Sequence, residues 1–389
     1  MVRDHPQELE GPAAWKGGSF DYNTNALRTL TKDELSEIDQ GLKLFEQCGL
    51  IDLLDINPAT FPLPKVGRQL AGLKYDLRYG PGVILLRGLP REKYSDDQLA
   101  KIYFALGTYM GFASPQSHNG ELLGSVIDIT DADAGVRGYQ AGGKQGFHTD
   151  GTACDIVSLM CLRAAKSGGA SRLVSALAVH NALVRKDPAL AQVFYDGFFY
   201  RQMDNDAEKA GIDPMSAEPV EVFAIRNGEF YCNMNSGEIK RAVEKGGVKL
   251  TDLQLEAYDF YMKIVNSDEY VLDMNIQEGD IQFVNNRSLL HGRAGYEDYD
   301  EVERRRYMLR LWLEVRDWPA RPQRQIGLTF DIARRWLANR TPSMEFPTNF
   351  MRSKQADIAA KQKAGVATSR LKPYESGGSK AFFETPTPT

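Results

Sequence analysis

The sequence is poor in cysteine and contains no long apolar run. Four cysteines in 389 residues, none of them in a CxxC pair, exclude a disulfide scaffold and lack the spacing of a structural zinc site. No apolar run approaches the roughly 20 residues of a membrane helix. The polar start of the chain has no apolar segment typical of a secretory signal. We therefore expect a soluble, cytoplasmic protein with no membrane partner.

Basic residues are not in excess either. The chain has 47 Lys and Arg residues against 52 Asp and Glu residues, and its formal net charge is −5. Because nucleic-acid binders usually carry a basic excess, we expect no nucleic-acid partner. A hydrophobic content of 42% is ample for a core and excludes a disordered chain.

No repeat of fixed period and no internal linker divides the chain. The expected organisation is an N-terminal lead-in and helix over residues 1–79, a core domain over 80–351 and a polar tail over 352–389. The sequence leaves the oligomeric state open, a homo-oligomer included.

Capping boxes predict three helices, and apolar runs predict four buried strands. The boxes begin at Thr31, Ser95 and Thr251, each followed three residues later by Glu or Gln. The apolar runs cover residues 83–89, 156–162, 281–286 and 307–315.

Other segments complete this pattern. An Asn-Gly pair at 227–228 predicts a β-hairpin, and residues 112–150 have the composition of a long polar loop. Many short strands interrupted by a few helices favour a mainly β, α+β fold with a jelly-roll core and helical insertions over alternating βα units.

Histidine is scarce, so the context of each of the five is informative. His148 and Asp150 are two residues apart, and in an extended segment both side chains point to the same face. Together with His291 they offer two imidazoles and one carboxylate, the set that binds iron in non-haem oxygenases and leaves coordination positions open. A His-x-Asp pair also occurs often by chance, and a solvated loop histidine is the alternative.

The predicted strand near residue 310 has an unusual face. Strand alternation places Arg306 and Arg310 on one side, with Met308 between them, and an entirely apolar set on the other. A charge inside a fold is costly unless it is paired. A bound dicarboxylate would pair it, because arginine binds carboxylate through two parallel hydrogen bonds. A solvated edge strand fits the same spacing equally well.

Four motifs together resemble the TauD/TfdA family of Fe(II)- and 2-oxoglutarate-dependent dioxygenases. They are HTD at 148–150, GGAS at 168–171, NNRSLLHGR at 285–293 and RRRYMLRLWL at 304–313. The resemblance covers roughly residues 80–316. It implies a double-stranded β-helix, or jelly-roll, core and an enzyme that uses Fe(II), 2-oxoglutarate and O2.

The resemblance also implies roles for single residues. The iron ligands, and so the catalytic centre, would be His148, Asp150 and His291. Arg306 would hold the distal carboxylate of 2-oxoglutarate, and the Ser171 hydroxyl would contact the same cosubstrate where the family has threonine. Arg310 would reach an anionic group of the substrate.

Three further polar residues lie near these motifs. We expect Asn286 to fix the loop before His291, close to the metal. Gln116 and Asn235 are candidates for substrate contact. A surface loop is an equal alternative for Gln116, as it is for His118, and a simple turn is slightly favoured for Asn235.

The implied reaction removes hydrogen from an unactivated C–H bond while 2-oxoglutarate is decarboxylated to succinate and CO2. Hydroxylation, desaturation or ring closure can follow. The expected substrate is a small carboxylate-bearing metabolite such as an amino acid, as in secondary metabolism, and the Asp150 carboxylate disfavours halogenation. The alternatives are a jelly-roll metal-dependent isomerase or hydrolase that does not use 2-oxoglutarate, and a non-catalytic small-molecule sensor.

Overall fold

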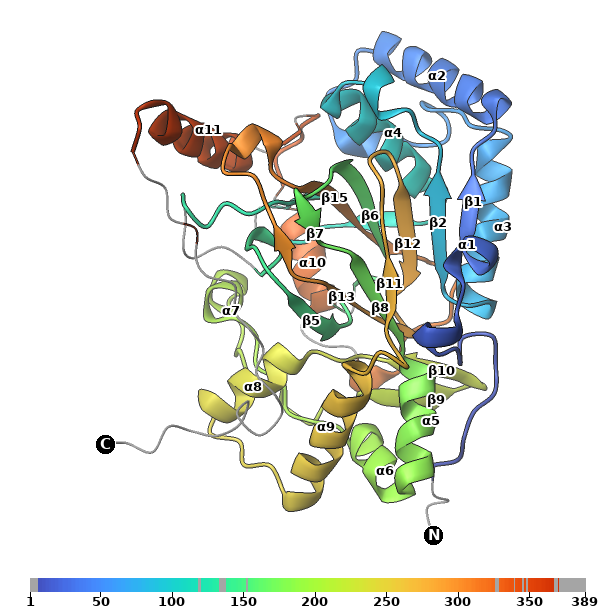
Figure 1. Ribbon diagram of the computed structural model, residues 1–389, viewed down its shortest axis with the longest axis vertical. Coiled ribbons are helices and arrows are strands. Elements are labelled where there is room, and N and C mark those ends of the chain that lie inside the picture. The colour runs from blue at the N-terminus through green and yellow to red at the C-terminus, as the bar shows by residue number, and fades with distance from the viewer. Residues whose placement is uncertain are drawn as a thin grey trace.

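Two β-sheets face each other in the middle of the molecule, and helices cover their outer faces (Figure 1). The computed structural model describes residues 6–117, 120–132, 138–151, 153–325, 329–338, 340–344, 346–347, 349–366 and 370. The architecture is therefore a mixed α+β fold, as expected from the sequence.

The larger sheet has seven strands. Its order is β1 (Leu27–Thr29), β2 (Val83–Arg87), β12 (Ile281–Asn285), β6 (Ile156–Arg163), β15 (Tyr307–Glu314) and β3 (Phe112–Ser114), and β4 (Leu123–Val126) also pairs with β15. All pairings are antiparallel except that of β1 with β2.

The smaller sheet has four antiparallel strands. Its order is β11 (Leu272–Met274), β8 (Ser171–Ser175), β13 (Leu289–Arg293) and β5 (Gln145–His148). Two further strand pairs are β9 (Phe223–Arg226) with β10 (Glu229–Cys232), and β7 (Ser167–Gly168) with β14 (Tyr296–Glu297). The turn between β9 and β10 holds Asn227 and Gly228 at φ values of 54° and 77°, which confirms the predicted Asn-Gly hairpin.

Helices precede, interrupt and follow the strands. They are α1 (Tyr22–Asn25), α2 (Lys32–Gln47), α3 (Val66–Tyr79), α4 (Asp96–Thr108), α5 (Ala176–Lys186), α6 (Pro188–Asp196), α7 (Asp204–Ala210), α8 (Ser236–Glu244), α9 (Asp252–Val265), α10 (Thr329–Ala338) and α11 (Asn349–Lys363). The capping boxes predicted at Thr31, Ser95 and Thr251 are all present, at the starts of α2, α4 and α9.

Strand alternation sorts the side chains of the larger sheet into two layers. Leu86, Met160 and Phe283 point to one face and pack with α2, α3 and α4 in one apolar core. Val157 and Val284 point to the other face and pack against the smaller sheet. The inner face of the larger sheet therefore looks into the space between the sheets.

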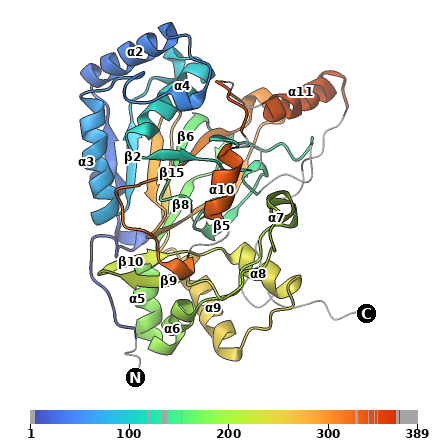
Figure 2. The ribbon, with the colours of Figure 1, turned by 180° about the vertical axis from the view of Figure 1, so that it is seen from behind.

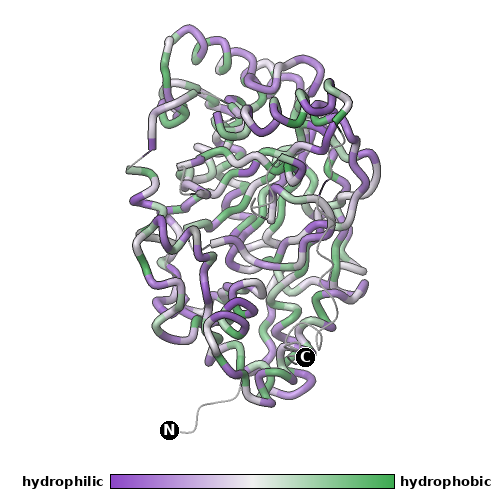
Figure 3. The backbone as a smooth tube through the Cα atoms, turned by 90° about the vertical axis from the view of Figure 1, so that its left-hand side faces the viewer, coloured by the Kyte–Doolittle hydropathy of each residue, from purple (hydrophilic) through white to green (hydrophobic). Residues whose placement is uncertain are grey.

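The smaller sheet repeats this arrangement. Val174, Leu290 and Phe147 point outward and pack with α5, α6 and α9. Leu173 and Leu289 point inward to the larger sheet. Figure 3 shows hydrophobic segments concentrated in the central strands and hydrophilic ones along the outer helices. Among the described helices, none is long and apolar enough to cross a membrane.

Several elements differ from the sequence-based expectation. Residues 112–150, expected to be a polar loop, contain the short strands β3, β4 and β5, which gain their stability from pairing with distant strands rather than from local pattern. His291 lies in a strand, β13, for which no apolar run was predicted. Helix α3 has no capping hydrogen bond at its start, so no local signal marks it. The expected polar tail begins inside α11, whose Met351 and Ile358 are buried.

The packing of α2 into the apolar core on this side of the molecule can be tested with two leucines on the same helix. Leu42 is buried in the core and Leu44 is 49% exposed. We expect Leu42→Ala to lower the free energy of unfolding by about 2–5 kcal/mol, because it leaves a cavity, whereas Leu44→Ala changes it by less than about 0.5 kcal/mol. Chemical denaturation followed by circular dichroism measures both, and equal losses would contradict this packing.

Candidate active site

Two neighbouring strands bring together two histidines that are distant in the sequence. In the smaller sheet β13 pairs with β5 so that His291 lies directly opposite His148. Their ring centroids are 4.4 Å apart. The register shifts just beyond His291, between that residue and Arg293, and both imidazoles lie beside the Asp150 carboxylate.

The backbone of Asp150, two residues beyond His148, is held by an asparagine from the other side of the site. Its N–H donates to Asn286 Oδ1 at 2.8 Å, and Asn286 Nδ2 donates to the carbonyl oxygens of Asp150 and Cys154 at 3.1 and 2.8 Å. The Asn286 side chain is completely buried. It therefore fixes the strand end that carries the carboxylate.

The carboxylate of Asp150 faces both imidazoles. Its Oδ1 lies 3.8 Å from His148 Nε2, and its Oδ2 lies 3.6 Å from His291 Nε2. The Trp312 indole donates to Oδ2 at 2.7 Å. In the part of the chain that the structure describes, this is the only group of three or more His, Cys, Asp or Glu residues whose ligand atoms converge, all within 4.8 Å.

The three side chains offer the donor atoms that a divalent metal requires, and the pKa shifts of His148 and Asp150 favour their metal-binding forms. His148 Nδ1 lies 2.9 Å from the Gly146 carbonyl, which leaves Nε2 for a metal. Burial, with the neighbouring His291, lowers the pKa of His148 to about 4, so its ring is neutral near pH 7. Burial opposes ionisation of Asp150, but Arg310 and the two histidines outweigh it and hold the pKa of Asp150 well below its usual range. Two imidazoles and one carboxylate fit a non-haem iron ion.

Arg306, directly before β15, and Arg310, within it, are both buried, which excludes the solvated edge strand. Arg306 and Arg310 are each 6% exposed, and β15 is paired along its length with β6 on one side and with β4 and β3 on the other. Arg310 Nε donates to Gln116 Oε1 at 2.7 Å, and Arg310 NH1 lies 3.5 Å from Asp150 Oδ1. The Gln116 amide nitrogen donates to the Arg310 carbonyl, so Gln116 holds this arginine in place.

Arg306 has no acidic side chain within ion-pair distance among the described residues. Burial and the neighbouring Arg293 lower the pKa of Arg306 to about 10. The guanidinium groups of Arg306 and Arg293 lie over the Tyr296 ring, 5.5 and 5.0 Å from its centroid. A buried cation without a counter-ion is costly, and this one is therefore suited to receive an anion.

Ser171 links the two sheets near these arginines. Its hydroxyl, on β8, donates to Gln282 Oε1 of β12 at 2.9 Å. In the register of the smaller sheet Ser171 lies opposite Arg293. The sequence analysis missed Gln282 and Arg293, although strand alternation around Phe283 and His291 would have placed both on the inner faces.

A cavity of ≈ 740 Å³ opens beside the histidines. Its wall includes His148, Asp150, Arg310 and Trp312 from the sheets, with Gln116. Further wall residues come from the segment 138–147 and from α7, α8, α9 and α10, and α10 is seen over the strands in Figure 2. His291, Ser171 and Arg306 are not among the lining residues, and His118 lies outside the described residues.

Asn235 is both a helix cap and part of this wall. Its Oδ1 accepts from the backbone N–H of Glu238 at 3.2 Å, at the start of α8. The segment before it is tied to the metal-binding motif, because Thr149 N–H donates to the Met234 carbonyl at 2.8 Å. Asn235 therefore caps a helix where a simple turn was slightly favoured, and its place in the wall keeps substrate contact as a prediction.

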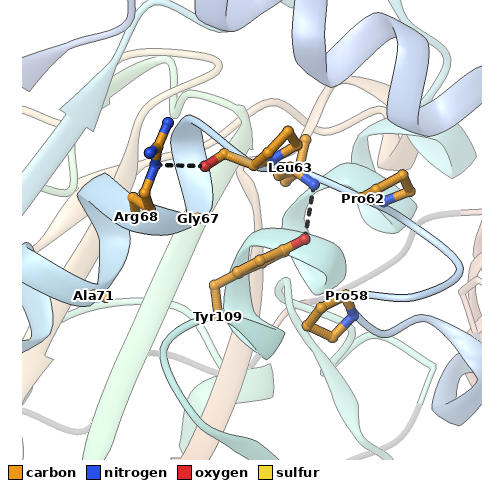
Figure 4. Close-up of a pocket in the computed structure, with 8 residues that line it drawn as sticks. Pro58, Pro62, Leu63, Gly67, Arg68, Ala71 and Tyr109 are labelled. Atoms are coloured by element: carbon orange, nitrogen blue, oxygen red, sulfur yellow. Dashed lines mark hydrogen bonds between the residues drawn. The ribbon is translucent and has the colours of Figure 1, made fainter.

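A second hollow, of ≈ 430 Å³, lies at the N-terminal side of the fold (Figure 4). Prolines and α3 line it, and Tyr109 donates from its hydroxyl to the Phe61 carbonyl while accepting from the Leu63 N–H. Its described wall contains no His, Cys, Asp or Glu. Its described wall therefore offers no carboxylate, imidazole or thiol as a metal ligand.

The fold and the converging side chains define a class of protein, the non-haem iron oxygenases. Residues 50–312 match the family described as taurine catabolism dioxygenase TauD, TfdA family. The match covers more than half of the chain, so the protein belongs to the TauD/TfdA family, and it is an Fe(II)- and 2-oxoglutarate-dependent dioxygenase. Both conclusions confirm the resemblance found in the sequence.

Similar proteins are known from bacteria and fungi. The chain is 26% identical over 330 residues to FR-33289 synthase of Streptomyces rubellomurinus, with 81% of this chain and 93% of that protein covered. It is 26% identical over 319 residues to a taurine hydroxylase-like protein of Stachybotrys chartarum, with 78% and 79% covered.

Solved structures share the fold at lower identity. An asparagine oxygenase in complex with Fe(II), (2S,3S)-3-hydroxyasparagine and succinate gives a TM-score of 0.59 at 18% identity, over 74% of this chain and 93% of that one. A variant of the non-haem iron oxygenase OrfP in complex with (3S)-hydroxy-L-Arg gives 0.55 at 17% identity, over the same shares.

The free energy of unfolding of the protein should depend on pH through Glu238, a residue of the cavity wall. Burial raises the pKa of Glu238 to about 7, from an ordinary value of 4.5. Because the folded-state pKa is raised, the stability that this carboxyl contributes is complete below pH 4.5 and is lost as the pH rises through about 7. Glu238→Gln, which cannot ionise, should therefore gain about 1–2 kcal/mol relative to the parent between pH 5 and pH 8.

Denaturant titrations at several pH values measure this difference in the free energy of unfolding. The control is Glu208→Gln, at an exposed carboxylate of α7, which should keep a constant difference from the parent. A pH-independent difference for Glu238→Gln would contradict the assignment of a buried, mostly protonated carboxyl.

Proposed function

We propose that the protein oxidises an aliphatic C–H bond of a small, carboxylate-bearing, amino-acid-like metabolite, with succinate and CO2 as co-products. The outcome would be hydroxylation, desaturation or ring closure, and the two facing sheets would form the double-stranded β-helix core of this family. One observation carries the proposal: the two histidines and the aspartate converge between the sheets beside two buried arginines, and one of these, Arg306, lacks an acidic partner among the described residues.

The proposed iron ligands are His148 Nε2, His291 Nε2 and one oxygen of Asp150. These atoms already converge, and the lowered pKa values of His148 and Asp150 favour the neutral imidazole and the ionised carboxylate that bind metals. Asn286 would keep the backbone of Asp150 in position, and Trp312 would orient its carboxylate through Oδ2. Three protein ligands leave the remaining coordination positions open.

The proposed site of the 2-oxoglutarate distal carboxylate is Arg306. Its guanidinium is buried and lacks an acidic partner among the described residues, so an incoming carboxylate would supply the missing counter-charge. The Ser171 hydroxyl would contribute a second hydrogen bond if it turned from Gln282 toward the ligand. When bound, iron and 2-oxoglutarate supply the oxidising chemistry with O2, and the protein positions the reactants and excludes water.

The proposed contacts to the substrate begin with Arg310. It lines the cavity beside Asp150, and Gln116 and the Tyr139 ring, 4.2 Å from its guanidinium carbon, fix its direction. A substrate carboxylate could accept from its remaining N–H groups. In this arrangement Gln116 acts through Arg310, and Asn235 contributes to the cavity wall. The asparagine oxygenase and OrfP complexes, which hold hydroxylated amino acids, support a substrate of this kind.

The cofactor pair can be tested without knowing the substrate. Anaerobic addition of Fe(II) and 2-oxoglutarate to the purified protein should give a weak charge-transfer band near about 500 nm. His148→Ala should abolish the band, because it removes an iron ligand. Arg306→Lys should keep it but raise the 2-oxoglutarate concentration for half-saturation by about tenfold, because lysine cannot form the paired hydrogen bonds.

The matched control is Arg304→Lys, an exposed position two residues earlier in the sequence, which should leave the half-saturation unchanged. Absence of the band in the parent protein, with iron shown to be bound, would refute the use of 2-oxoglutarate. It would instead favour a metal-dependent isomerase or hydrolase.

The hydrogen bonds from Asn286 to the backbone around Asp150 give a separate prediction. Asn286→Ala removes all three hydrogen bonds to the Asp150 and Cys154 backbone, so iron affinity should fall by about 10–100-fold. Competition with a coloured chelator measures this affinity. Asn25→Ala, at an exposed asparagine whose side chain bonds only within α1, should not change it. Equal iron affinities of the Asn286 variant and the parent would show that the carboxylate is oriented without these hydrogen bonds.

A further inference from the structure

One carboxylate in the cavity wall is bound only by neutral groups. Glu238, on α8, accepts a hydrogen bond from Gln202 Nε2 at Oε2 (3.1 Å) and one from Asn235 Nδ2 at Oε1 (3.2 Å). In the described part of the chain no Lys, Arg or His nitrogen lies within ion-pair distance of it. A carboxylate offers about four acceptor positions, so Glu238 can accept further donors.

The basic residues nearest to it on the same helix have other contacts. Lys240 is paired with Glu244 one turn along the helix, at 3.5 Å. Arg241 Nε donates to the Arg201 carbonyl at 2.9 Å, although Arg241 remains the main positive charge that Glu238 senses. Asp206 of α7 adds a second negative charge to this part of the wall. Glu238 is therefore only partly exposed and is poor in compensating cations.

Beside the metal-binding residues the cavity wall carries a positive charge. Arg310 presents a guanidinium to the same cavity, and an iron ion would add further positive charge. The cavity thus has an anion-binding region formed by β15 and a carboxylate on the inserted helix α8. Its volume of ≈ 740 Å³ is within the usual range of ligand pockets, roughly 300–1,000 Å³.

We propose that Glu238 is the anchor for a positively charged nitrogen of the substrate, so that the enzyme selects carboxylates that also carry an ammonium or guanidinium group. This inference rests on the function proposed above and names its substrate class more closely. A charged donor would complete the acceptor positions of Glu238 and favour its ionised form, whereas a neutral substrate of the same shape would leave the carboxylate uncompensated. Burial raises the pKa of Glu238 to about 7 in the empty cavity, which is consistent with a missing counter-charge.

The charged nitrogen has two sources in an amino acid, the α-ammonium group and a cationic side chain. Two ligand pairs separate them. L-arginine and L-citrulline differ in a guanidinium against an uncharged ureido group. L-norvaline and pentanoate differ in the α-ammonium group alone. Each ligand is titrated calorimetrically into the protein loaded with Fe(II) and 2-oxoglutarate under anaerobic conditions.

We expect the charged member of at least one pair to bind about tenfold or more tightly than its neutral partner, as for a charge-assisted hydrogen bond. Glu238→Gln should remove that preference and leave the affinity for the neutral partner within about twofold. If Glu238→Gln removes the preference for arginine over citrulline, Glu238 binds a side-chain cation. If it removes the preference for norvaline over pentanoate, Glu238 binds the α-ammonium group.

Two variants serve as controls for charge. Glu208→Gln removes an exposed carboxylate of the neighbouring helix α7 that does not line the cavity, and should keep the preference of the parent. Glu244→Gln removes a carboxylate of the same wall that already has Lys240 as partner, and should weaken it less than Glu238→Gln does.

The inference is overturned if neither pair shows a preference in the parent, if no ligand of either pair binds, or if Glu238→Gln weakens both members of a pair equally. The charge-transfer band of each variant is recorded first. A normal band with no preference rejects the role of Glu238 and leaves the proposed function intact, whereas absence of the band in the parent rejects the proposed function itself.

Discussion

The buried carboxylate of Asp150 is the constraint around which the rest of the site is organised. A carboxylate between two sheets is stable only if charges and donors surround it. Arg310 provides the positive charge, the two imidazoles lie beside the carboxylate, the Trp312 indole donates a hydrogen bond, and Asn286 holds the backbone. The same contacts keep the carboxyl ionised, which is the state that a metal ligand needs.

Strand pairing supplies these groups from four separate parts of the chain. The register of β13 on β5 sets His291 opposite His148, and alternation on β15 turns Arg310 and Trp312 to the inner face. The outer faces of both sheets are occupied by apolar contacts with helices. A slip of one residue in any of these strands would exchange core and site side chains, so the packing of the two outer layers also fixes the chemistry of the inner one.

Much of this site could be predicted from sequence, because its residues follow local patterns or family motifs. Alternation alone put Arg306 and Arg310 on one face, although it could not say whether that face was buried. The capped helices could be predicted equally well. The short strand β5 could not, because it depends on pairing with β13. The role of Glu238 could not either, because its surroundings depend on Gln202 from a distant segment. Non-local contacts of this kind produce no periodic pattern in the sequence.

The division between the sheets and the inserted helices suggests how chemistry and specificity are separated in this fold. The groups proposed for iron and 2-oxoglutarate lie on β5, β8, β13 and β15 or at their ends, where strand pairing fixes them within a rigid layer. Glu238, Gln202 and Asn235 belong to or flank α7 and α8, which contribute little to the sheet packing. Changes in these helices can therefore alter the charge of the cavity wall while the metal-binding geometry is kept. In the described part of the chain, hydrogen bonds between Thr149 and Met234 join the two sets of residues.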